Sequence, residues 1–104
     1  MYEEAKKIIE KSNLTDEEKL SLLLQIEPEN ALREAEEKKK YHIIVKYYIE
    51  KKDYDKAKEY IERAINDKAD KEVNEIILEY KDIILKDKEL SNNIAKYLLD
   101  IENI

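Results

Sequence analysis

The chain contains no glycine, and this absence limits its possible folds more than any other feature. The tight turns of β-hairpins usually need glycine where φ is positive, so a sheet of ordinary hairpins does not suit this composition. Proline is nearly absent as well, with Pro28 as the single example. We therefore expect an all-α protein, and its 104 residues predict one domain over residues 1–104.

Apolar residues recur at helical spacing along the chain and predict about six helices. Thr15 and Glu18 form a capping-box pattern, and Pro28 suits the first turn of the next helix. Asp53 and Asp70 are placed to open two later helices. The predicted helices cover residues 2–11, 15–26, 28–51, 54–66, 71–86 and 88–101.

The helix predicted over residues 28–51 contains a stretch, residues 33–40, with almost no apolar side chains. Glu34 with Lys38 and Glu36 with Lys40 are acid-first pairs four residues apart. Each such pair contributes about 0.2–0.5 kcal/mol to a solvated helix. We expect this stretch to be helical and exposed.

Residues 41–66 read as two amphipathic helices joined at Asp53. Tyr41, Ile44 and Tyr48 lie on one face of the first, and the second carries large and small apolar residues at Tyr54, Ala57, Ile61 and Ala64. These residues resemble the aromatic, leucine, tyrosine and small-residue positions of a tetratricopeptide repeat over residues 38–71, although Val45 replaces a usually small residue. The flanking segments resemble degenerate repeats. The resemblance implies a short array of helical hairpins, and a compact helical bundle is the alternative architecture.

The resemblance also implies a binding site, because the first helix of each tetratricopeptide hairpin lines a groove. Carrying the groove positions over to this repeat selects five residues, Lys39, His42, Lys46, Ile49 and Glu50. Two ammonium groups, an imidazole and an apolar side chain suit a peptide or protein partner with an acidic segment. The predicted function is a non-enzymatic interaction scaffold, with self-association left open.

The net charge of −6 is unevenly distributed along the chain. Residues 1–34 and 72–104 each carry −4, whereas residues 35–71 carry +2. A broad basic face for nucleic acid is not expected from this balance, because both ends would repel the phosphate backbone.

Several other functions lack the residues that they need. There is no cysteine for disulfides or thiolate metal sites, and His42 is the single histidine, so we expect no metal, no cofactor and no enzymatic activity. A glycine-rich phosphate loop is excluded. No apolar run reaches the ~18–20 residues of a membrane span, and the first residues lack a signal-peptide pattern, so we expect a soluble protein, cytoplasmic if it is natural.

Two alternative functional interpretations remain open at the level of the sequence. The absence of glycine and cysteine, the dense Lys and Glu and the regular caps also suit a computationally designed helical protein without natural activity. The acidic ends would suit a small inhibitor that imitates nucleic acid. Regular rows of carboxylates on one surface would favour this last interpretation.

Overall fold

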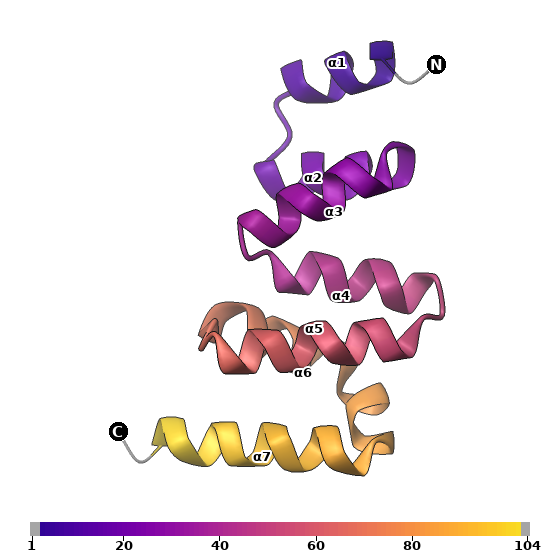
Figure 1. Ribbon diagram of the computed structural model, residues 1–104. Helices are drawn as coiled ribbons and strands as arrows, with labels where there is room; N and C mark the ends of the chain where they lie inside the picture. Colours follow the sequence, from indigo (N-terminus) through magenta and orange to yellow (C-terminus); the bar gives the residue numbers. More distant parts are fainter. Residues whose placement is uncertain (1–2, 103–104) are drawn as a thin grey trace.

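Seven helices make up the part of the chain that the computed structural model describes, residues 3–102, with side chains described for residues 3–100. Figure 1 shows them stacked along the long axis of a molecule of 48 × 29 × 19 Å, with α2 behind α3 and α6 behind α5. No strand occurs within these residues, so the all-α prediction is confirmed. The helices are α1 (Glu3–Lys11), α2 (Asp16–Ile26), α3 (Pro28–Glu37), α4 (Tyr41–Glu50), α5 (Tyr54–Asn66), α6 (Asp70–Lys86) and α7 (Lys88–Glu102). The first predicted helix was expected to begin at Tyr2, which lies outside the described residues.

The prediction of one continuous helix over residues 28–51 is wrong. A turn at Lys39, where φ is 55°, divides this segment into α3 and α4. The N–H of Lys40 donates to the carbonyl of Ala35 at 2.8 Å, the hydrogen bond that closes a Schellman turn. The turn allows both Ala35 and Tyr41 to be buried, at 0% and 4% exposure. Burial of two apolar side chains outweighs surface ion pairs worth a few tenths of a kcal/mol, about 0.2–0.5 each.

Only one of the two predicted ion pairs in this region forms within the described residues. Lys38 and Glu34 lie 2.9 Å apart, as expected. Glu36 instead contacts Arg63 of α5 at 2.5 Å. Lys40 reaches Glu17 of α2 at 3.3 Å. Residues expected to form local pairs on a solvated helix therefore connect α3 and its following turn to other helices.

The helix starts follow the predicted capping residues in most places. Thr15 and Glu18 form both hydrogen bonds of a capping box, and Pro28 is the first residue of α3. The Asp53 side chain accepts from the N–H of Lys56 at 3.2 Å and so caps α5. Asp70 differs, because it lies in the first turn of α6 and accepts a hydrogen bond from Tyr97 of α7.

The core lies in the middle of the stack, around α4. This helix packs against α2, α3, α5 and α6, and α5 in turn packs against α7. Most residues of the tetratricopeptide-like pattern are buried: Tyr41 and Ile44 in α4, and Ala57, Ile61 and Ala64 in α5. Tyr54, which belongs to the same pattern, is 50% exposed and is not a core contact. The largest fully buried side chains are Ile44, Val45, Ile61, Val73 and Ile76.

Two tyrosines from different helices converge on the turn between α5 and α6. The hydroxyl of Tyr41 in α4 donates to Asp67, and the hydroxyl of Tyr97 in α7 donates to Asp70. Burial and these hydrogen bonds raise the pKa of both phenols to about 12. The neutral phenols therefore hold α4 and α7 to the same turn.

The helix α6 is bent at Tyr80, where φ is −118° and ψ is 24°. The half before the bend packs behind α5, and in Figure 1 the chain then turns downward towards α7. The second half of α6 consequently approaches α7 rather than continuing along α5.

Three lysines occupy the positive-φ position of helix-ending turns where glycine is the usual residue: Lys39, Lys52 and Lys68. A side chain costs about 1 kcal/mol in this conformation. We expect each Lys→Gly substitution to raise the free energy of unfolding by ~0.5 kcal/mol, measured by urea denaturation. The matched Lys→Ala variants keep the steric cost and should not change stability. Equal effects of glycine and alanine at all three positions would contradict the prediction.

The variants Tyr41→Phe and Tyr97→Phe should each lower the free energy of unfolding by about 1 kcal/mol, because each removes one hydrogen bond to the α5–α6 turn. The folded-state pKa of each phenol lies above its unfolded value, so this stabilisation is present below pH ~10 and is lost as the pH rises through 12. Denaturation between pH 8 and pH 11 should therefore show a smaller alkaline loss in both variants. Tyr54→Phe, at an exposed site, is the control.

Candidate functional site

The five predicted groove residues do not form one helix face. Lys39 is exposed in the turn before α4, whereas His42, Lys46, Ile49 and Glu50 lie on α4 itself. The sequence predicted one continuous helix through Lys39 to Glu50, which would have carried all five residues. The turn at Lys39 separates that residue from the other four.

His42 contacts α6 through both ring nitrogens. Its Nδ1 lies 3.4 Å from a carboxylate oxygen of Glu75, and its Nε2 lies 2.5 Å from Glu79. The ring is also 6.2 Å from that of Tyr80. The contact with His42 lowers the pKa of Glu79. His42 therefore joins α4 to α6, and both of its ring nitrogens already contact carboxylates of the same chain.

A third carboxylate, Glu72, lies on the same face of α6. The residue is 9% exposed, and its Oε1 has no hydrogen-bond partner among the described residues. Burial raises the pKa of the Glu72 carboxyl. The backbone N–H of His42, at the start of α4, favours the charged carboxylate and partly offsets this increase. This row of carboxylates was not predicted from the sequence, although the spacing of Glu72, Glu75 and Glu79 by three and four residues indicates one helix face.

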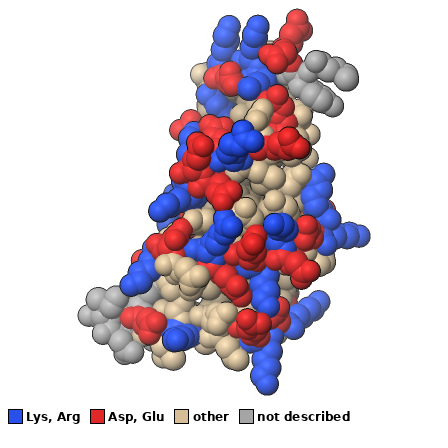
Figure 2. Space-filling view, in the orientation of Figure 1, with Lys and Arg blue, Asp and Glu red and all other residues tan. Residues whose placement is uncertain are grey.

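These carboxylates change the charge expected on the α4 face. At the N-terminal end of α4 a partner's acidic segment would meet Glu75 and Glu79 beside His42. Lys46 is exposed and lies close enough to Glu79 to lower that residue's pKa further. Figure 2 shows positive and negative side chains interspersed over the visible face, without a large region of one sign. An acidic partner is therefore better accommodated towards the C-terminal end of α4.

An apolar cleft of about 670 Å³ opens at that C-terminal end, and we call it the Ile49 cleft. Ile49 of α4 lines it together with side chains from the other three helices around it. Its apolar lining also includes the second half of α6, which the bend at Tyr80 directs towards α7. The other apolar lining residues are Tyr54, Ala57, Ile61, Ile83 and Leu90.

The rim of the Ile49 cleft carries charges of both signs. Lys58 of α5 lies 3.3 Å from Asp87 and 3.2 Å from Glu89. These contacts raise the pKa of Lys58 and tie α5 to the start of α7. Two further lysines on the rim, Lys86 and Lys88, take part in no ion pair within residues 3–100. The charge available to a ligand at this rim is therefore positive.

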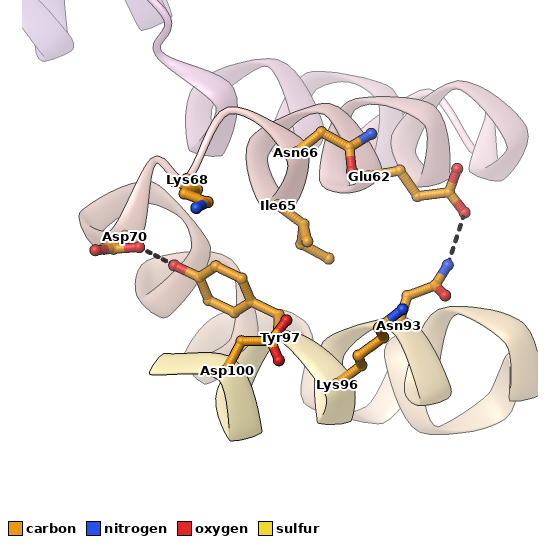
Figure 3. A pocket seen from close by; sticks show the side chains of 9 residues that line it. All are labelled: Glu62, Ile65, Asn66, Lys68, Asp70, Asn93, Lys96, Tyr97 and Asp100. Carbon is orange, nitrogen blue, oxygen red and sulfur yellow. Dashed lines mark hydrogen bonds between the residues drawn. The ribbon is translucent and has the colours of Figure 1, made fainter. Parts of the chain in front are cut away.

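A second cleft of about 690 Å³ lies between α5, the start of α6 and α7, and Figure 3 shows its lining. Ile65 points into it from α5, opposite the ring of Tyr97. Several of its polar groups are already paired, since Tyr97 donates to Asp70 and Asn93 lies 3.5 Å from Glu62. Its remaining charges are mixed and do not converge on one position, so the Ile49 cleft is the better candidate site.

The described helices contain neither a cluster of metal ligands nor a membrane-spanning segment. No group of three or more His, Asp or Glu side chains in this part of the chain is arranged to hold a metal ion. Within residues 3–102, each helix is either too short or too polar to span a bilayer.

No protein-family model, curated protein or solved structure matches this chain. The likeness to tetratricopeptide repeats therefore depends on the residue pattern within residues 38–71 and on the stacking of neighbouring helices.

Replacing the buried carboxyl of Glu72 should stabilise the protein at neutral pH. The pKa of this carboxyl is higher in the folded chain than in the unfolded one, so its charged form destabilises the fold at neutral pH. This destabilisation disappears as the pH falls towards and below the raised pKa. We expect Glu72→Gln to raise the free energy of unfolding at pH 7 by about 1 kcal/mol. The gain should shrink at pH 4.5.

The comparison is made by urea denaturation at both pH values. Glu75→Gln is the matched control, because it removes a carboxylate that contacts His42 and should not stabilise the chain. A lower stability of Glu72→Gln at pH 7 would show that the carboxylate's contact with the start of α4 outweighs its burial.

Proposed function

We propose that this protein is a non-enzymatic scaffold that binds a peptide or protein partner on the surface formed by α4, α5, α6 and α7. The observation that carries the proposal is the Ile49 cleft, where a residue expected to line a groove lies in an apolar cleft with lysines on its rim. Stacked helical arrays commonly present such surfaces to partners.

The stacking of α2, α4 and α6 supports this proposal. α4 packs against both α2 and α6, so the three helices form one continuous row, as the first helices of successive hairpins do in tetratricopeptide arrays. A short row provides a small contact surface. We therefore expect an affinity in the micromolar range, on the order of −8 kcal/mol.

The alternative of a designed protein receives less support from the turns. Designed helices are normally ended with glycine in the left-handed position. This chain has lysine at all three such positions within the described residues: Lys39, Lys52 and Lys68. A strategy that caps helices by rule would not choose these residues.

The alternative of an acidic nucleic-acid mimic is also less well supported. Its surface would need rows of free carboxylates, but the row on α6 includes two that contact His42 and one that is buried. The interspersed charges in Figure 2 do not resemble the uniform spacing of phosphates.

The proposal is tested by crosslinking capture from a cell lysate, followed by titration of the purified partner. Lys46→Glu should weaken binding about tenfold, equivalent to ~1.4 kcal/mol, because it places a carboxylate on α4 about one helical turn before Ile49. Lys39→Glu has the same charge change in the turn outside the α4 face and should bind as the wild type does. A partner that binds both variants equally, or no capture by the wild type, would contradict the proposal.

A further inference from the structure

We propose that the Ile49 cleft is an anchor site for a short acidic peptide segment, with one large apolar side chain in the cleft and carboxylates on both sides of it. This inference rests on the proposed scaffold function and specifies the chemistry of the partner. Its volume of about 670 Å³ is within the range of ~300–1,000 Å³ that is common for ligand sites.

The apolar part of the site comes from four helices. Ile49 of α4, Ile83 of α6 and Leu90 of α7 contribute branched side chains, and α5 supplies Ala57 and Ile61. Tyr54 stands at the edge and is 50% exposed, although it was expected to be a core contact. A half-exposed aromatic ring beside an apolar cleft can cover an inserted side chain without a large loss of its own conformational entropy.

The carboxylates of the partner are inferred from the charges that the protein leaves uncompensated. Asp87 and Glu89 are both held by Lys58, at 3.3 and 3.2 Å. Lys86 and Lys88 remain on the same rim without an ion pair within residues 3–100. The rim lysines Lys58, Lys86 and Lys88 outnumber the rim carboxylates Asp87 and Glu89 by one, so a carboxylate next to the apolar anchor would meet a net positive rim.

A further cation lies on α4, before the residue that gives the cleft its name. Lys46 precedes Ile49 by three residues on α4, which is close to one helical turn of 5.4 Å. A segment lying along α4 towards its C-terminal end would pass Lys46 and then reach the Ile49 cleft, whose rim carries Lys86 and Lys88. The order of charges predicts a partner sequence with acidic residues flanking a single leucine, isoleucine, phenylalanine or tyrosine.

A phage-displayed library of random peptides, selected against the full chain, tests this inference. We expect enrichment of peptides with one large apolar residue between acidic ones. A labelled synthetic peptide of the enriched sequence should then bind Lys86→Glu/Lys88→Glu at least tenfold more weakly than the wild type, and Tyr54→Ala at least threefold more weakly.

Matched variants separate the site from general effects of charge and exposure. Lys7→Glu/Lys11→Glu makes the same charge change on the exposed surface of α1, and Leu85→Ala removes a 72% exposed apolar side chain that does not line the cleft. Both should bind the peptide as the wild type does. All the substituted side chains are exposed, so their thermal midpoints should stay close to that of the wild type.

Two outcomes would overturn the anchor site while leaving the scaffold function intact. One is an enriched peptide that is weakened by Lys46→Glu but binds Lys86→Glu/Lys88→Glu at full affinity. The other is a concentration-dependent dimer that Leu99→Ala abolishes, because the exposed Leu99 beside Asp100 would then identify a second copy as the occupant. A selection that enriches nothing, together with no capture from lysate, would overturn both proposals.

Discussion

The burial of α4 against four neighbouring helices holds the array together. Three consecutive residues of this helix, Ile43, Ile44 and Val45, are almost completely buried. A helix that is apolar on most of its circumference is stable only when it is covered on several sides. The neighbours α2, α3, α5 and α6 provide this cover, and the array extends in both directions from α4.

The turns show how a chain without glycine can stack its helices closely. Lys39, Lys52 and Lys68 adopt positive φ values that glycine would adopt without steric cost. The cost of about 1 kcal/mol at each turn is offset by hydrogen bonds of the Schellman type, at 2.8, 2.9 and 3.0 Å from the N–H groups of Lys40, Asp53 and Ala69. Around the last of these turns, the hydroxyls of Tyr41 and Tyr97 add contacts from two other helices.

The candidate site was predictable where it depends on one helix and unpredictable where helices meet. Lys46, Ile49 and Glu50 lie on α4, as their spacing indicated, and Ile49 faces a cleft. The carboxylates that contact His42 come from α6, more than 30 residues further along the chain. Lys86 and Lys88 on the rim come from the junction of α6 and α7, and nothing local relates them to Ile49.

Local sequence signals are enough to predict the all-α class and most of the helix starts, because capping, proline placement and apolar periodicity act over a few residues. They did not determine the break between α3 and α4, since the local charge pairs favoured a continuous helix and the burial of Ala35 and Tyr41 decided against it. Tertiary packing also directed Glu36 to Arg63 and Tyr97 to Asp70. These partners are far apart in the chain, so only the packing of the whole array brought them together.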